Sequence, residues 1–194
     1  MNAFYSLIQL NTGCNPKESY EFLKKSIRKS ADQGHASAQV NLGLQYERGH
    51  GVTQSNTEAV KWYRKAAEQG NVWGQYDLGL CYEYGRGVNK SLSTAIEWYK
   101  KSAEQGNVNA QYNLANLYLR GQGAAQDDKL AFSWFMKAAE QGDAPSQYNI
   151  GRMYLLDKGA DINFLESRFW IKQALENDDA YIGALAQQLW DDYK

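Results

Sequence analysis

The chain has few of the residues that build reactive or membrane-embedded sites. Its two cysteines among 194 residues are too few for a disulfide framework. The formal net charge of −1 gives no basic excess, which argues against a surface for nucleic acid or anionic membranes. No stretch approaches the roughly 18 apolar residues of a membrane-spanning helix, so we expect no membrane insertion. Two prolines and 13% aromatic residues argue against disorder.

The scarcity of histidine argues against catalysis. His35 and His50 are the only histidines, and they fall at a predicted helix start and in a predicted loop. No Ser-His-Asp set, Cys-His pair or metal-spaced cluster accompanies them. Glu68, Glu104 and Glu140 recur at one register, which is typical of a structural role. We therefore expect no catalytic residue, no cofactor and no metal, and a protein that is not an enzyme.

The first residues predict no targeting signal. Met1 to Leu10 contains no lysine or arginine, and Ser6 and Gln9 interrupt its apolar stretch, whereas a secretory signal has a basic start and a longer apolar core. A faint likeness to a lipoprotein cleavage site before Cys14 is weakened by Asn11. The sequence as written predicts a cytoplasmic protein, or a periplasmic or secreted one if a leader has been removed.

What the chain does contain is a repeat of 36 residues, marked by the Gln-Gly pairs at Gln33, Gln69, Gln105 and Gln141. A fixed period in this range is typical of an array of stacked helical units. We name residues 34–69, 70–105, 106–141 and 142–177 units 1 to 4. Residues 1–33 are predicted to form an N-terminal partial repeat and residues 178–194 a C-terminal capping helix, all in one solenoid domain.

Each unit predicts two helices. The first is announced by N-cap residues and, in unit 2, spans roughly Val72 to Tyr84. Four registers, three and four residues apart, define its fixed face. They are Gln39/Gln75/Gln111/Gln147, Leu42/Leu78/Leu114/Ile150, Gly43/Gly79/Ala115/Gly151 and Tyr46/Tyr82/Tyr118/Tyr154. Glycine inside a helix costs about 1 kcal/mol relative to alanine, so its recurrence predicts a helix packed too closely for a larger side chain.

A loop with two glycines, as in Gly85-Arg86-Gly87, separates the first helix from the second. Unit 4 departs from this pattern with Asp157-Lys158-Gly159. The second helix begins after an N-cap residue in every unit and carries a tryptophan that we expect in the core. The N-cap residues and tryptophans are Ser55, Ser91, Asp127 and Asn163, and Trp62, Trp98, Trp134 and Trp170.

Both ends fit the same register. Residues 19–33 match a second helix, and residues 1–12 are a candidate for a degenerate first helix. Residues 179–193 match a first helix, with Trp190 at the tyrosine position. Half-units that cover an exposed end are expected in such arrays.

The unit resembles the Sel1-like repeat family. The motif G-x-A-x-A-Q-x-x-L-G-x-x-Y-x-x-G-x-G-V runs from Gly34 to Val52, and A-x-x-W-Y-x-K-A-A-E-Q-G runs from Ala59 to Gly70. The resemblance covers roughly residues 19–193 and implies an all-α fold, a right-handed α/α superhelix of 36-residue helix-turn-helix repeats. It also implies a scaffold or adaptor role. A cysteine-rich branch carries a disulfide in each repeat, and this chain lacks those cysteines.

Positions that vary between units are the candidates for recognition. On the first helix they lie opposite the fixed face, and first helices line the concave groove in related superhelices. The candidate partner-binding residues are Asn41, Leu44, Arg48, Trp73, Asp77, Leu80, Tyr84, Asn113, Asn116, Arg120, Asn149 and Arg152. Ser37, Asn109, Pro145 and Leu156 share the stripe.

Two features of this stripe suggest a contact with a protein or peptide. Asn41, Asp77, Asn113 and Asn149 form a polar ladder able to bond an extended backbone. Trp73 and Tyr84, with Leu44 and Leu80, are large residues on a face expected to be wet. The alternatives are that the ladder bridges or caps neighbouring helices and that the apolar residues pack between adjacent first helices.

These observations favour a non-enzymatic scaffold that binds a protein or peptide in the groove. One alternative is an immunity or inhibitor protein that neutralises a bacterial toxin or effector. Another is a periplasmic or host-interaction regulator. Self-association through the terminal helices is a further prediction.

Overall fold

The computed structural model describes residues 16–177 and 180–192. These residues form ten α-helices and no strand. The helices are α2 Pro16–Asp32, α3 Ala36–Arg48, α4 Asn56–Glu68, α5 Val72–Tyr84, α6 Leu92–Glu104, α7 Val108–Arg120, α8 Asp128–Glu140, α9 Ala144–Leu155, α10 Phe164–Leu175 and α11 Ala180–Asp192. The predicted all-helical solenoid is confirmed, while the predicted helix in residues 1–12 lies outside the described residues.

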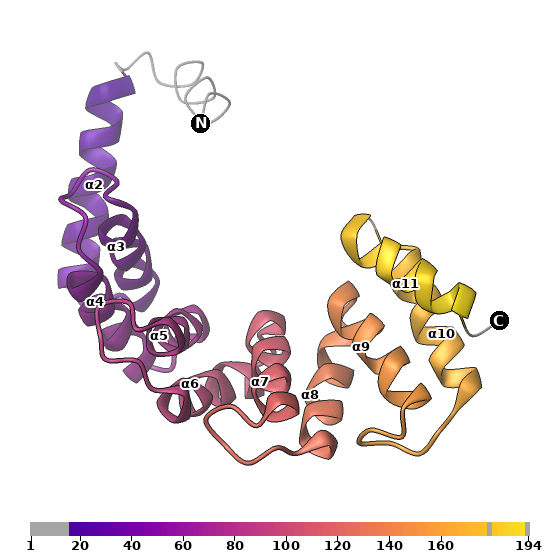
Figure 1. Cartoon of the computed structure of the whole chain (residues 1–194). Helices are drawn as coiled ribbons and strands as arrows, with labels where there is room; N and C mark the ends of the chain where they lie inside the picture. The colour runs from indigo at the N-terminus through magenta and orange to yellow at the C-terminus, as the bar shows by residue number, and fades with distance from the viewer. Residues whose placement is uncertain (1–15, 178–179, 193–194) are drawn as a thin grey trace.

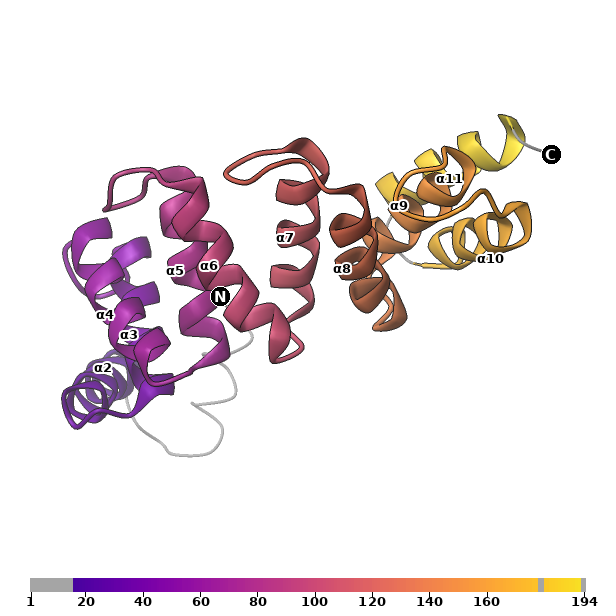
Figure 2. The ribbon, with the colours of Figure 1, turned by 90° about the horizontal axis from the view of Figure 1, so that it is seen from below.

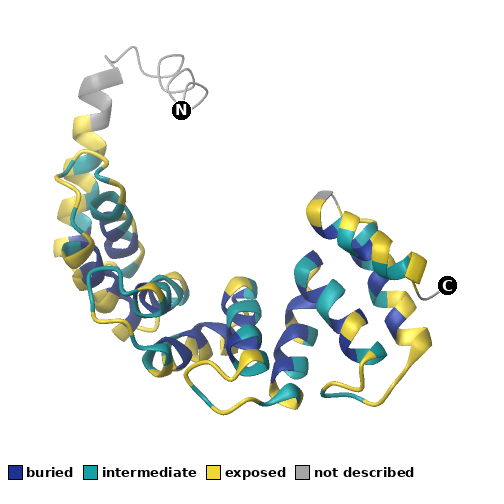
Figure 3. Cartoon of the chain, in the orientation of Figure 1, coloured by how far each residue is buried: buried dark blue, intermediate teal, exposed yellow. Residues whose placement is uncertain are grey.

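The helices form two rows that bend into an arch (Figure 1). The first helices α3, α5, α7 and α9 make the inner, concave row, and the second helices α4, α6, α8 and α10 make the outer row. The loops after α5 and α7 project along the same edge of the array (Figure 2). Buried residues gather where the two rows face each other, leaving the concave and convex faces to solvent (Figure 3).

The predicted N-caps set the helix starts. Asn71, Asn107 and Asp143 accept a hydrogen bond from the backbone three residues on, and so do the second-helix caps Ser55 and Asp127. Each bond satisfies one of the free N–H groups of a first turn. The histidine of unit 1 is the exception, because its side chain makes no capping bond and its Nδ1 lies 3.0 Å from the Ser30 carbonyl oxygen.

The interior glycines are explained by the helix that packs against them. A Cβ at Gly79 would lie 2.6 Å from the ring of Tyr99, which is fully buried. Gly43 and Gly151 meet Tyr63 and Ile171 in the same way, as the sequence predicts.

The second loop glycine has a different cause. Gly87 has a φ of +73°, and a Cβ there would lie 2.3 Å from the Asn56 carbonyl oxygen of the preceding unit. Only glycine fits both the left-handed conformation and this close approach. In unit 4 the first loop glycine is replaced by Asp157, which adopts the left-handed conformation with a φ of 54°.

The recurring glutamines form a ladder of bonds to each other within a unit and to a backbone carbonyl of the preceding repeat. Gln69 Nε2 donates to Gln39 Oε1 at 2.7 Å, and Gln39 Nε2 donates to the Ala31 carbonyl at 3.3 Å. Gln105–Gln75 and Gln141–Gln111 repeat the first bond at 2.8 Å. The buried side chains of Gln39, Gln75 and Gln111 are thereby satisfied at both the amide nitrogen and the amide oxygen, which explains why units 1 to 3 keep glutamine at both registers.

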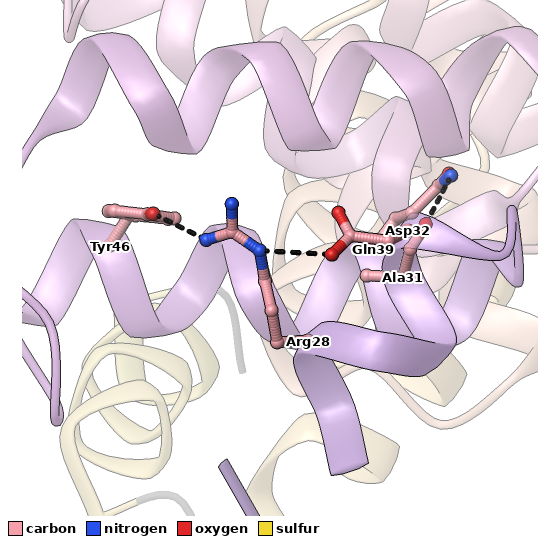
Figure 4. A network of polar contacts seen from close by, with 5 residues as sticks. All are labelled: Arg28, Ala31, Asp32, Gln39 and Tyr46. Carbon is pink, nitrogen blue, oxygen red and sulfur yellow. Dashed lines mark hydrogen bonds and ion pairs between the residues drawn. The ribbon is translucent and has the colours of Figure 1, made fainter. Parts of the chain in front are cut away.

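Polar contacts also tie α2 to α3 (Figure 4). Arg28 donates to the Tyr46 hydroxyl at 2.9 Å and to Asp32 at 3.2 Å, beside the bond from Gln39 to Ala31. Arg64 repeats the first contact with Tyr82 one unit later. These bonds account for the tyrosine at this register in units 1 and 2.

Candidate partner-binding groove

The predicted stripe lies on the inner row, and its members differ in exposure. Trp73 and Tyr84 on α5 are 55% and 58% exposed, and the two lie on one face with Asp77 and Leu80 between them. Exposed members of the stripe are Asn41, Arg48, Trp73, Tyr84, Arg120 and Arg152, and half-buried members are Leu44, Asp77, Leu80, Asn113, Asn116 and Asn149. The concave surface of unit 2 therefore presents two large aromatic side chains to solvent.

A pocket opens between α3 and α5 in this surface. Its volume is about 300 Å³, and it joins four candidates from two helices, namely Asn41, Leu44, Trp73 and Asp77. The rest of its lining is Ser37, Val40, Asn71 and Tyr76. The structure thus brings together residues that the sequence placed on one stripe but in different units.

Small residues in unit 1 open this pocket. Ser37 and Val40 occupy the registers that Trp73 and Tyr76 occupy one unit later. The larger pair packs edge to face with centroids 6.3 Å apart, and Tyr76 also contacts Tyr99 at 5.9 Å. The hollow between α3 and α5 is therefore a consequence of two small side chains at positions where unit 2 has two large ones.

Asp77 is the charged member of the pocket lining. Burial raises the pKa of its carboxyl to about 7, and the nearby Glu47 carboxylate adds to this rise. Arg48 and Arg86 act in the opposite direction but do not restore the ordinary pKa. At the corresponding registers the other units have an uncharged asparagine.

A network that the sequence analysis missed fixes the far end of this surface. Arg86 donates to Glu47 Oε1 at 2.7 Å, and the Tyr63 hydroxyl donates to Glu47 Oε2 at 2.6 Å. The Arg86 guanidinium lies 5.0 Å from the centre of the Tyr84 ring. Burial, with the bond to Glu47, raises the pKa of the Tyr63 hydroxyl. The network joins α3, α4 and the loop after α5, and it positions Tyr84.

The sequence contained a signal for this network. Glu47 and Glu83 share a register, and their tyrosine partners Tyr63 and Tyr99 share another. Tyr99 donates to Glu83 at 2.5 Å, as Tyr63 does to Glu47. Pairing the two registers required knowing which turns of the two helices face each other.

Some candidates are engaged within the fold. Leu44 and Leu80 are half-buried and pack against the hydrophobic core. The side-chain amides of Asn116 and Asn149 donate to the carbonyls of Tyr112 and Pro145, four residues earlier in their own helices. The polar ladder is therefore uneven, with Asn41 and Asp77 at the pocket and Asn149 bonded to its own helix.

The described residues show neither a metal-binding cluster nor a membrane-spanning helix. They contain no group of three or more His, Cys, Asp or Glu that could hold a metal ion. No helix among them has the length and apolar character needed to cross a bilayer. The Cys81 thiol is buried, and that burial raises its pKa to about 12, which leaves it protonated and unreactive at neutral pH.

Comparison with known proteins identifies the repeat. The Sel1 repeat matches four segments that together make up most of the chain, residues 36–71, 74–107, 108–143 and 144–179. The chain belongs to the Sel1 repeat family. Members of this family generally act as non-catalytic scaffolds that mediate protein–protein interaction. No curated protein matches the chain.

Solved Sel1 repeat structures share the fold. A protective antigen of uropathogenic Escherichia coli is 38% identical, with a TM-score of 0.78 over 80% of this chain and 33% of that one. A Sel1 repeat protein from Oxalobacter formigenes is 36% identical, with a TM-score of 0.76 over 84% of this chain and 47% of that one. The chain therefore spans a third to about half of these two proteins. An immunity protein from Pseudomonas aeruginosa is 23% identical, with a TM-score of 0.50 over 80% of this chain and 58% of that one, a likeness of fold alone.

Proposed function

We propose that this chain is a non-enzymatic adaptor that binds a segment of another protein along its concave groove. The main contacts are Trp73, Tyr84 and the pocket between α3 and α5. The observation that carries the proposal is the exposure of Trp73 and Tyr84 on one face of α5. Tryptophan and tyrosine are the residue types that contribute most often to binding hot spots.

Pre-organisation of this surface supports the proposal. Glu47 holds Arg86 against Tyr84, and Trp73 packs edge to face on Tyr76. Side chains that are ordered before binding lose less conformational entropy when the partner arrives. A rigid aromatic surface beside a pocket is therefore suited to anchoring an extended segment.

An affinity pull-down from the native cell tests the groove. The bait is the full chain, compared with Trp73→Ala/Tyr84→Ala and with a matched control, Phe164→Ala/Phe169→Ala, which removes two exposed aromatics from the outer row. Circular dichroism checks that all three are folded. We expect a protein that the wild type and the control recover and the groove variant loses. Equal recovery by all three would place the contact elsewhere.

Narrower roles are distinguished by the partner that is recovered. In the immunity or inhibitor role, the partner is a toxin or effector whose activity the wild type suppresses and the groove variant does not. In the regulator role, fractionation of cells that express the natural gene finds the product in the periplasm or outside the cell, whereas a cytosolic adaptor stays in the soluble interior fraction. Self-association through the terminal helices is a separate prediction that light scattering tests.

A further inference from the structure

We propose that the pocket between α3 and α5 receives a lysine or arginine side chain of the bound segment, held between Trp73 and the Asp77 carboxylate. This inference rests on the proposed function, because it names the chemistry that the groove recognises.

The negative charge in the pocket favours a cationic ligand. Asp77 is the charged residue of the lining, whose other members are Ser37, Val40, Asn41, Leu44, Asn71, Trp73 and Tyr76. Within the described residues the Asp77 carboxylate forms no hydrogen bond or ion pair, and its pKa is shifted by burial and by charges at longer range. A carboxylate that is partly desolvated and unpaired gains most from a positive charge brought by a ligand.

The charged neighbours do not supply that cation. On α3, Glu47 is paired with Arg86 at 2.7 Å and adds negative charge near Asp77, while the exposed Arg48 lies at the end of the helix. On α4, the Tyr63 hydroxyl is bonded to Glu47. Tyr76 and Cys81 on α5 are neutral at physiological pH, since burial raises the pKa of each. The positive charges of Arg48 and Arg86 therefore do not offset the effect of burial and of Glu47 on the Asp77 carboxylate, whose pKa stays raised.

The shape and walls of the pocket suit a long basic side chain. Trp73 and Tyr76 provide aromatic walls, and about 300 Å³ leaves room for a lysine or arginine stem. Cations bind favourably over aromatic rings, best of all over tryptophan. Aromatic side chains beside one unpaired carboxylate on the same helix form an arrangement that recognises a basic residue rather than an apolar or acidic one.

The repeat itself indicates that Asp77 is not there for the fold. Units 1, 3 and 4 have Asn41, Asn113 and Asn149 at this register, so an uncharged amide satisfies the same position in the same architecture. A desolvated carboxylate is unfavourable in the unbound protein. Its presence in the unit that also carries Trp73 is accounted for by a cationic ligand.

The experiment is a selection from a random-peptide display library on the full chain at pH 8, with two variants. Asp77→Asn gives unit 2 the residue of the other three units. The double variant Asp77→Asn/Asn113→Asp keeps the wild-type net charge but moves the carboxylate from unit 2 to unit 3. At that position the first helix of the preceding unit carries the large Trp73 and Tyr76 in place of the small Ser37 and Val40. The double variant therefore separates recognition in the pocket from general electrostatic attraction.

We expect the wild type to select peptides with lysine or arginine at one position. Replacing that residue by norleucine should weaken binding at least about tenfold, and both variants should lose the preference. The wild-type affinity for such a peptide should rise about tenfold from pH 6 to pH 8, because the pKa of the free Asp77 carboxyl is about 7 and the cation binds its ionised form. The affinity of Asp77→Asn should be flat over this range.

Three results would overturn the inference. If the wild type selects peptides without a basic position, or if Asp77→Asn selects the same basic peptides, the pocket does not recognise a cation, although the groove still binds protein. If the double variant keeps the preference, general electrostatic attraction explains it. If none of the chains selects a peptide and the pull-down also recovers no groove-dependent protein, the groove proposal fails and the pocket with it.

Discussion

In units 1 and 2 a polar pair of side chains joins the first helix to the second, whereas in units 3 and 4 an apolar pair occupies the same position. Tyr63 and Tyr99 donate to Glu47 and Glu83. At the same registers units 3 and 4 have Phe135 with Leu119 and Ile171 with Leu155. The same backbone arrangement thus accepts either chemistry, provided that both members change together, since a buried polar group left alone is costly.

The difference shows what the polar version adds. Glu47 also accepts from Arg86, and this bond fixes the surface around Tyr84. A leucine at that position, as in units 3 and 4, would hold the helices together but would leave the arginine without its acceptor. The N-terminal half of the array therefore combines helix packing with the organisation of the groove, and the C-terminal half retains the packing alone.

The largest effect is expected when one member of a polar pair is removed. Tyr99→Phe should lower the free energy of unfolding by about 2–3 kcal/mol, because it leaves the half-buried Glu83 carboxylate without its donor. Tyr99→Phe/Glu83→Leu, which reproduces the pair of unit 3, should lie within about 1 kcal/mol of the wild type. Urea unfolding measures both values. A double variant as unstable as the sum of the two single variants would show that the contact is not interchangeable.

A smaller effect is expected at Asp77, where unit 2 differs from the other three. Its pKa of about 7 lies above the ordinary value of 3.8, so ionisation destabilises the folded state. The stability of the wild type should therefore fall as the pH rises from about 4 to about 7, and Asp77→Asn should not show this fall. At pH 8 the variant should be more stable by about 1–2 kcal/mol, and near pH 4 the two should be alike. Thermal unfolding at a series of pH values checks this, and a constant difference at all pH values would contradict it.

The smallest effect on stability is expected from a substitution in unit 4, where the glutamine ladder ends. Asn177 stands at the register of Gln69, Gln105 and Gln141, and it donates to the Gly142 carbonyl at 3.1 Å. The buried Oε1 of Gln147 is thus left without a hydrogen bond. Asn177→Gln should restore the missing rung and stabilise unit 4 by about 1 kcal/mol.

Hydrogen exchange gives the local readout for this change. We expect slower exchange of the amides of α9 and α10 in Asn177→Gln, with little change in α3 and α4. Gln105→Asn is the converse control, since it should free Gln75 Oε1 and speed exchange in unit 2. Unchanged exchange in α9 would mean that the shorter side chain is already compensated there.

Much of the fold could be predicted from the sequence because each unit repeats the same N-caps, glycines and hydrophobic periodicity. The caps at Asn71 and Ser55, the length of α5 and the steric role of Gly79 were predicted and are confirmed. Of the stripe, the exposure of Trp73 and Tyr84 was expected, whereas Leu44 and Leu80 proved to be packed against the core. Their depth depends on how tightly neighbouring first helices approach, which helical periodicity alone does not give. The partner-binding role of the stripe stays a prediction.

The period, the helix ends, the fixed face and the family could be predicted from local patterns, because caps, glycines and periodicity act over one or two helical turns. The tertiary packing fixed which registers meet. It paired Glu47 with both Tyr63 and Arg86, bonded Gln69 to Gln39 within unit 1, and opened a pocket where Ser37 and Val40 face Trp73 and Asp77. These contacts join residues about 16 to 39 positions apart, and their geometry is set by the packing of whole helices rather than by any local propensity.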